Sequence, residues 1–183
     1  MKTSLMTLTR QLSAWQRWQS PLGGMLLART PLGLAGIWFD GQKDHPGELA
    51  GQPAANDPLL LRTVAELAAY FDGAPARFTQ PLDLHGTDFQ RAVWQQLLNI
   101  AAGATCSYAE IARAVGSPAA VRAVGAAIGR NPVSVIVPCH RVIGSAGALT
   151  GYAGGLERKR ALLQLESTTT TGTGMQQRLD EAA

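Results

Sequence analysis

The first eighty residues alternate between short apolar runs and turn-forming residues. Between positions 11 and 39, the runs MLLA and LAGIWF are flanked by Pro-Leu-Gly segments, a pattern typical of short antiparallel strands. A helix is predicted after them, because Asp57 can cap it, Pro58 suits its first turn and Gly73 follows its end. Its apolar face has helical spacing and consists of Leu60, Val64, Leu67 and Phe71. Residues 1–80 are therefore predicted to form an α/β domain with a small antiparallel sheet.

From residue 81 onward the apolar spacing is mostly helical. The segment TDFQRAVWQQLLNI has Thr87 or Asp88 as a candidate N-cap. In the next helix, SYAEIARAVG, Ser107 and Glu110 form an S-x-x-E capping box. After Gly116, Ser117 and Pro118 are expected to cap and open a third helix, PAAVRAVGAAIGR. Two short helices joined by a tight turn predict a helix-turn-helix.

The remaining segments complete the predicted domain organisation. The apolar run VSVIV, a glycine-rich loop and a last helix, LERKRALLQLE, follow the helix-turn-helix. Residues 81–166 are thus predicted to form a mostly α domain. Residues 167–183, STTTTGTGMQQRLDEAA, are polar and low in complexity, which predicts a disordered tail.

Composition narrows the class of protein. The chain has 183 residues, of which 46% are hydrophobic and 16% charged, as in a compact globular protein. No apolar run reaches the length of a membrane span, and the N-terminal stretch lacks the apolar core of a secretory signal. We therefore expect a cytoplasmic protein with no membrane partner. The two cysteines and three histidines do not have zinc-site spacing, so no metal is expected.

The second helix of the predicted helix-turn-helix has an unusual composition for a DNA reader. Recognition helices in the major groove carry polar side chains that read base edges, whereas this helix is almost all Ala, Val and Gly, with Arg122 in its first half. Small side chains allow a close approach to a protein core or to the minor groove, and the composition leaves both open. In the minor groove, Arg122 could enter the duplex and replace a displaced base.

The stretch PCHRV contains the main candidate for chemistry. A lone cysteine is by default a small buried hydrophobe, but Pro138 places Cys139 at a strand end or turn, and His140 follows directly. In the last helix, Glu166 shares a face with apolar positions three and four residues earlier. A buried carboxylate needs a partner. A Cys–His–Glu relay, with a bound water between thiol and imidazole, would supply one; a capping or surface role for Glu166 is the alternative.

These motifs resemble those of one family, the O6-alkylguanine-DNA alkyltransferases. The matching stretches run in the family's order across residues 86–166: GTDFQRAVW, SYAEIARAVG, VRAVGAAIGRNP, PCHRV and GYAGGLERKRALLQLE. The first eighty residues resemble the family's N-terminal α/β domain. Two cysteines are too few for the four-cysteine zinc module of multi-domain members.

The resemblance implies direct-reversal DNA repair by a methyltransferase that acts once. The target would be double-stranded DNA carrying O6-alkylguanine, or O4-alkylthymine, with the base flipped out from the minor-groove side. The alkyl group would pass to Cys139, and the resulting thioether would not be hydrolysed. The resemblance implies no cofactor and a monomer.

The resemblance also assigns roles to individual residues. Cys139 would be the acceptor, His140 the base, Glu166 the residue that orients it, and Asn131 the residue that fixes the active-site turn. The expected substrate contacts are Tyr108, Val142, Tyr152, Ala153 and Gly154. The expected DNA-binding positions are the arginine finger Arg122 and its neighbours Ala120, Val121, Ala123 and Gly125. Lys159 would support the pocket loop.

The sequence departs from the family pattern at three positions. Ala102 stands where many members have Pro, Val121 where Ala is usual, and Ala153 where some carry Ser, so only its backbone could bind O6. Two other functions are compatible with parts of the sequence. A lesion sensor that binds DNA without transferring the alkyl group would need only the helix-turn-helix.

A cysteine hydrolase would need only the Cys–His–Glu set and would leave Arg122 without a role.

Overall fold

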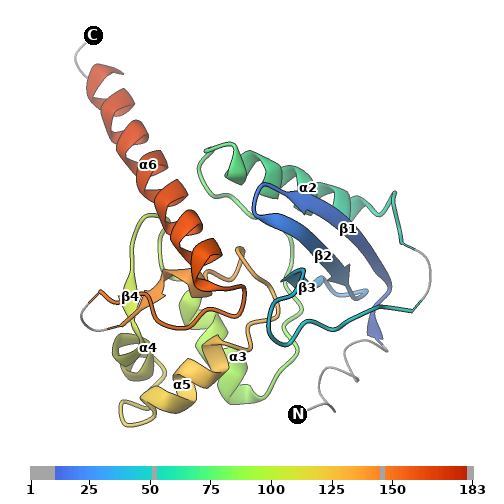
Figure 1. The fold of residues 1–183 in the computed structure, drawn as a ribbon, viewed down its shortest axis with the longest axis horizontal. Coiled ribbons are helices and arrows are strands. Elements are labelled where there is room, and N and C mark those ends of the chain that lie inside the picture. The colour runs from blue at the N-terminus through green and yellow to red at the C-terminus, as the bar shows by residue number, and fades with distance from the viewer. Residues whose placement is uncertain (1–10, 51–52, 145–146, 181–183) are drawn as a thin grey trace.

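A three-stranded antiparallel sheet with one helix forms the N-terminal half of the chain, and the C-terminal half is mostly helical, as the sequence predicts (Figure 1). The computed structural model describes residues 11–50, 53–144 and 147–180, and side chains as far as residue 169. Most of the stretch that argues against a secretory signal lies outside these residues. No helix in the described ranges is long and apolar enough to cross a membrane.

The sheet has the strand order β1 (Ala14–Ser20), β2 (Gly23–Arg29), β3 (Leu34–Phe39). β1 is half buried, and its tryptophans pair across to β2. All six residues of β3 are buried, because the main core covers one face and a smaller cluster around Trp38 covers the other. β3 thus lies at the centre of the molecule, where it can contact the C-terminal half.

Helix α2 (Pro58–Phe71) covers the sheet and begins as predicted (Figure 1). The Asp57 side chain accepts hydrogen bonds from the backbone N–H groups of Leu59 and Leu60, which would otherwise lack partners. Its buried face includes Leu60, Leu67 and Tyr70. The last turn therefore brings Tyr70 into the core, close to the second half of the chain.

The first two helices of the C-terminal half have reciprocal caps. In α3 (Asp88–Leu97), Thr87 is the N-cap, and it forms a capping box with Gln90, which decides between the two candidate caps. In α4 (Tyr108–Ala114), the predicted box between Ser107 and Glu110 is present. Such boxes satisfy two backbone donors at once, so these helix starts were readable from sequence.

The start of α5 (Val121–Ile128) differs from the prediction. Its N-cap is Ala120, with no side-chain hydrogen bond. Ser117 and Pro118 lie in the preceding turn, where the Ala120 N–H donates to the Ser117 carbonyl. The helix is held by packing, since α5 contacts both α3 and α4 and buries Val124, Ala127 and Ile128. The helix-turn-helix exists, with a longer turn than expected.

The apolar run VSVIV before the cysteine is not a strand. Only Val133 pairs with the sheet, through a single bridge to Ile37 of β3, and the next residues form tight turns. Val135 has φ of 72°, a left-handed conformation that is strained for a β-branched residue. The run is apolar because it crosses the core, and its turns lead directly into the cysteine.

The two halves share one core. A continuous cluster of buried side chains includes Ile37 and Phe39 of the sheet together with Trp94 of α3 and Val137. β3 also exchanges backbone hydrogen bonds with residues 132–134: the Ile37 N–H donates to Pro132, and the Ser134 N–H donates to Ile37, both at 2.9 Å. The boundary near residue 80 remains a prediction.

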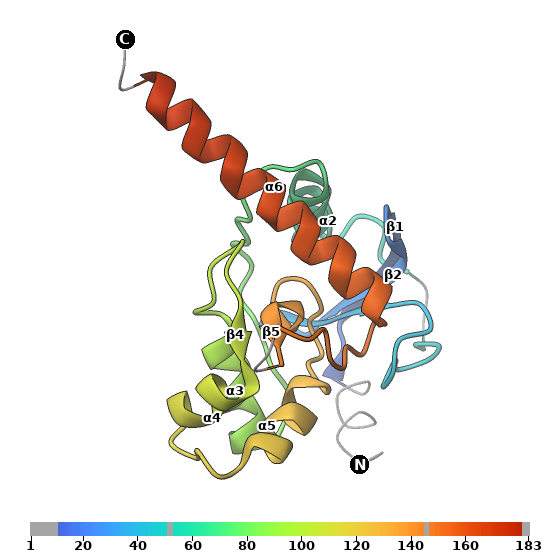
Figure 2. The ribbon, with the colours of Figure 1, turned by 60° about the vertical axis from the view of Figure 1, so that its left-hand side comes forward.

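The last helix, α6 (Leu156–Asp180), extends well past the packed body (Figure 2). The sequence predicts a disordered tail from residue 167, whereas this structure continues the helix to Asp180. The first hydroxyls of the Thr-rich stretch bond back along the helix: Thr168 and Thr169 both donate to the Leu165 carbonyl. These bonds are local, between residues three and four positions apart on the same helix.

Candidate functional site

Cys139 begins a short 3₁₀ turn, η1 (Cys139–Arg141), and is 5% exposed. The side-chain amide of Asn131 lies 3.1 Å from its sulfur and also donates to the carbonyls of Val133 (3.2 Å) and Val137 (2.8 Å). The Asn131 carbonyl accepts from the Val133 N–H at 3.0 Å. One buried amide therefore holds both ends of the turn that presents the thiol.

Burial raises the pKa of the Cys139 thiol, although the Asn131 amide and the Lys159 charge act against it. The resting sulfur is therefore a protonated thiol. A thiol is a weak nucleophile and reacts well only after its proton is removed. The site needs a base.

His140 is fully buried, and its Nε2 lies 2.9 Å from Glu166 Oε1. Because an ionised carboxylate can only accept, Nε2 carries the proton and donates. Burial lowers the pKa of His140, which keeps the ring neutral. Its Nδ1 has no protein partner among the described residues. A neutral imidazole with a bare Nδ1 can accept a proton.

Glu166 lies on α6 and accepts hydrogen bonds from several groups. Arg141 donates from Nε to Oε2 at 2.9 Å and from Nη2 to Oε1 at 2.7 Å. The Tyr70 hydroxyl donates to Oε1 at 2.9 Å, and the Gly103 N–H to Oε2 at 3.3 Å. Burial alone would raise the pKa of Glu166, but the bonds from His140 and Arg141 outweigh it and hold the pKa well below its usual range.

Adjacent residues in a 3₁₀ turn point about 120° apart, unlike neighbours in a strand. Cys139 therefore turns toward Asn131 while His140 turns toward Glu166. The structure brings together all four residues expected to carry the chemistry, within a single buried cluster.

The loop after β5 (Val142–Ile143) is held from inside by Lys159. Its ammonium donates to the carbonyls of Val142, Thr150 (2.9 Å) and Gly151 (3.5 Å). The Tyr108 hydroxyl, from the first residue of α4, donates to the Thr150 carbonyl at 3.0 Å. The side chains of α4 and α6 thus meet on this loop.

The N-terminal half holds the other end of the loop. The Lys43 N–H donates to the Ala153 carbonyl at 3.0 Å, and Arg158 donates from Nη1 to Gly154 (3.1 Å) and from Nε to Leu22 (2.9 Å). The Arg158 guanidinium also lies 4.8 Å from the ring centre of Phe39. Ala153 is therefore held by the backbone of the N-terminal half, and Gly154 by the Arg158 side chain, which also contacts Leu22 of that half.

Tyr152 is half-buried in this loop, and its hydroxyl, which is itself buried, has no hydrogen-bond partner among the described residues. Gly154 packs against it: a Cβ at Gly154 would lie 2.7 Å from the Tyr152 ring and 3.3 Å from Phe39. Any larger residue would push the tyrosine ring aside. This position requires glycine for close approach.

The expected DNA-binding residues of α5 fall into two groups. Arg122 and Ala123 are exposed, Val121 is 36% exposed, and Ala120 is half buried. Gly125 instead faces α4, where a Cβ would lie 3.6 Å from the Tyr108 ring. The helix therefore satisfies both interpretations of its small residues: one face packs in the core, and its N-terminal turn is open.

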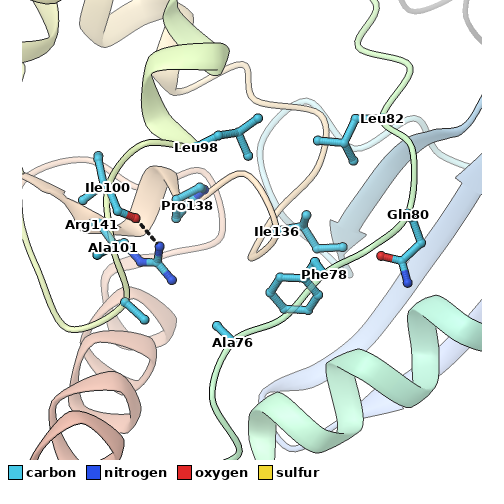
Figure 3. Close-up of a pocket in the computed structure, with 11 residues that line it drawn as sticks. Ala76, Phe78, Gln80, Leu82, Leu98, Ile100, Ala101, Ile136, Pro138 and Arg141 are labelled. Carbon is cyan, nitrogen blue, oxygen red and sulfur yellow. Dashed lines mark hydrogen bonds between the residues drawn. The ribbon is translucent and has the colours of Figure 1, made fainter.

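A hollow of about 370 Å³ lies behind the turn, beside Pro138 and Ile136 (Figure 3). At one end, Arg141 donates to the Ile100 carbonyl. Cys139 does not line this hollow, so it is not the place where a group could reach the sulfur.

Sequence reasoning missed four residues that support the site. Arg141 is part of the PCHRV motif, and the expected burial of Glu166 was a signal that its carboxylate needs a cationic partner. Tyr70 and Arg158 make their contacts across the two halves. Gln42 does so too, accepting from the Phe39 N–H and the Ser134 hydroxyl. For Tyr70, Arg158 and Gln42, no local sequence pattern predicts the contact.

Two family models match the chain and together cover most of it. Residues 88–168 match the DNA binding domain of 6-O-methylguanine DNA methyltransferase, and residues 4–84 match its ribonuclease-like domain. The first match spans the helix-turn-helix, the cysteine turn and the start of α6.

Individual proteins are similar over nearly their whole length. A methylated-DNA–protein-cysteine methyltransferase of Mycobacterium tuberculosis is 49% identical over 150 residues, which is 81% of this chain and 89% of that protein. One from Methanosarcina barkeri is 45% identical, over 81% of this chain and 93% of that protein. The crystal structure of Mycobacterium tuberculosis OGT in complex with DNA has a TM-score of 0.78 and 46% identity, covering 85% of this chain and 94% of the other. This chain belongs to the 6-O-methylguanine DNA methyltransferase family.

Proposed function

We propose that this protein repairs O6-alkylguanine in double-stranded DNA by moving the alkyl group onto Cys139. The Cys139 thiol gives its proton, through a bound water, to Nδ1 of His140, while Glu166 keeps that ring in the required tautomer. The sulfur then bonds to the alkyl carbon, the bond from that carbon to O6 breaks, and its electron pair leaves with guanine. The product is a thioether, which water does not cleave, so each molecule acts once.

Val142 and residues 150–154 are proposed as the wall of the base pocket. The Val142 carbonyl already accepts from Lys159, but a carbonyl has a second lone pair, which is available to the guanine amino group. The Ala153 N–H would donate to O6, and Tyr152 would line the pocket beside it. Tyr108 would leave the Thr150 carbonyl to donate to guanine N3 as the leaving base gains charge.

The open N-terminal turn of α5 is proposed to enter the minor groove. Arg122 would fill the space left by the flipped base, with Ala120, Val121 and Ala123 against the groove walls. Gly125 would act as a spacer, since it packs on Tyr108 and brings α5 close to α4. Because acceptor and DNA-binding helix lie in one chain, we expect a monomer to be active. O4-alkylthymine is a second expected substrate.

One observation carries this proposal above the others: the buried Cys139 is followed by a buried His140 whose Nε2 lies 2.9 Å from Glu166 Oε1, which leaves Nδ1 available as a base. A lesion sensor would have no use for the base. A hydrolase would need a path for water to a thioester, and would leave the exposed Arg122 turn without a role.

The decisive experiment is the intact mass of the protein after exposure to a duplex containing one O6-methylguanine. We expect a single addition equal to one methylene, mapped to Cys139, and an equal loss of lesion. The matched control is Cys106→Ser, which removes the other cysteine and should react fully, whereas Cys139→Ser should not. Loss of neither lesion nor thiol in folded wild-type protein would contradict the proposal.

A further inference from the structure

The N-terminal half contributes one side chain directly to the catalytic cluster. The Tyr70 hydroxyl of α2 donates to Glu166 Oε1 at 2.9 Å, although the two residues are 96 positions apart in sequence. Figure 2 shows α2 beside the middle part of α6, the helix that carries Glu166. Tyr70 is 3% exposed, and its ring is packed against Phe71 and Phe78, with centroids at 5.3 and 5.8 Å. The position of the hydroxyl is therefore fixed by packing.

Tyr70 shares an oxygen with the catalytic histidine. Glu166 Oε1 accepts from Tyr70, from His140 Nε2 and from Arg141 Nη2, while Oε2 accepts from Arg141 and Gly103. A carboxylate offers about four acceptor sites, and five bonds share them here, three of them on Oε1. The three donors on Oε1 compete for its electron density, and less remains to stabilise a proton on His140.

Tyr70 differs from the other donors because it adds no charge. Burial and the nearby Glu166 carboxylate raise the pKa of its hydroxyl well above the usual range, so it donates at every working pH. The charged groups that face His140 are Glu166, Arg141 and Lys159. Burial, Arg141 and Lys159 lower the pKa of His140, and only Glu166 raises it. A neutral donor on Oε1 weakens that single opposing effect.

We propose that Tyr70 is a positioning residue for alkyl transfer: its hydroxyl orients Glu166 Oε1 toward His140 and limits the charge that Oε1 presents to the ring. This rests on the proposed function, in which His140 is the base. Through Tyr70, the N-terminal domain would then contribute to alkyl transfer as well as to the fold. His140 then remains neutral at rest and ready to accept the thiol proton.

The test compares Tyr70→Phe with a matched control, Thr63→Val. The first removes only the hydroxyl and keeps the packed ring. The second removes a buried hydroxyl of the same helix, whose partner among the described residues is the Leu59 carbonyl. Single-turnover rates at saturating methylated duplex are measured between about pH 5 and 9, the range in which a histidine titrates. Affinity for unmodified duplex is measured separately.

In Tyr70→Phe we expect the acid limb of the rate profile to move to higher pH by about half a unit, since Glu166 would stabilise the imidazolium more strongly. The plateau rate should fall roughly tenfold, a part of what a general base contributes. DNA affinity should not change. Thr63→Val should keep the wild-type profile even where its melting temperature falls.

Histidine ring NMR of the unreacted protein separates this inference from the proposed function. The pKa of His140, assigned by its absence in His140→Gln, should rise in Tyr70→Phe and not in Thr63→Val. This readout needs no alkyl transfer, so it remains informative even where the wild type takes up no alkyl group. A Tyr70→Phe protein with a lower melting temperature but an unchanged His140 titration and rate profile would overturn the inference.

Discussion

The amide nitrogen of Asn131 lies 3.1 Å from the sulfur of Cys139 and donates to two carbonyls of the same turn. The contact joins the end of the helix-turn-helix to the reactive residue. A single side chain thus sets both the shape of the turn and the environment of the thiol.

Asn131→Asp should test this double role. An aspartate has a similar shape but cannot donate, so two carbonyls and the sulfur lose their partner. The free energy of unfolding should fall by about 2–4 kcal/mol, and the pKa of Cys139 should rise because a negative charge lies beside it. Urea unfolding and the pH dependence of thiol alkylation measure the two effects. Asn99→Asp, on the exposed surface, should change stability by less than about 0.5 kcal/mol.

Stability should decline as the pH falls below neutrality. Burial lowers the pKa of His140, so the unfolded chain takes up this proton first, near pH of about 6.5. The pKa of Glu166 is also lower in the folded protein, so its contribution is full above about pH 4.3 and is lost below it. Urea unfolding should give its highest free energy between about pH 7 and 8, because burial raises the pKa of Cys139 and the unfolded chain loses that proton first at higher pH. In His140→Gln the loss between about pH 7 and 5 should be smaller; an equal loss would contradict this account.

Arg122→Ala should separate base flipping from chemistry. Transfer from a methylated duplex should slow by roughly ten- to a hundredfold, because the flipped state loses the side chain that fills its place and unstacking costs a few kcal/mol. Reaction with the free base O6-benzylguanine needs no flipping and should keep its rate. The control Arg62→Ala removes an exposed arginine from α2, far from α5 in sequence, and should leave both rates unchanged. Equal slowing of both substrates by Arg122→Ala would argue for a structural role.

The alkylated protein should be less stable than the free protein. A methyl group on Cys139 must fit beside Asn131 in a site that is 5% exposed, and overfilling a packed site costs about 1–3 kcal/mol. For a chain of this size, the melting temperature should drop by roughly 3–10 °C. Calorimetry on protein whose adduct has been checked by mass would show this. An unchanged melting temperature would mean that the turn absorbs the group without strain.

The local sequence was sufficient to predict the helices that begin with a capping residue. Thr87 and Ser107 cap their helices as expected because a capping box involves residues only three positions apart. The start of α5 was misplaced, because packing rather than a cap decides it. The sequence leaves a strand or a turn open for the VSVIV run before Cys139, because apolar runs of strand and buried turn look alike. In the structure it is a series of turns, with Val135 in a left-handed conformation.

The sequence by itself determined which residues could carry the chemistry: Cys139, His140, Glu166 and Asn131 are all in the buried cluster. Only the tertiary structure decided how they work together. The neutral state of His140 and the ionised state of Glu166 depend on burial and on donors from distant segments, Arg141 and Tyr70 among them. Sequence spacing holds no information on contacts between segments separated by dozens of residues, because those contacts arise only when the two halves close over one core.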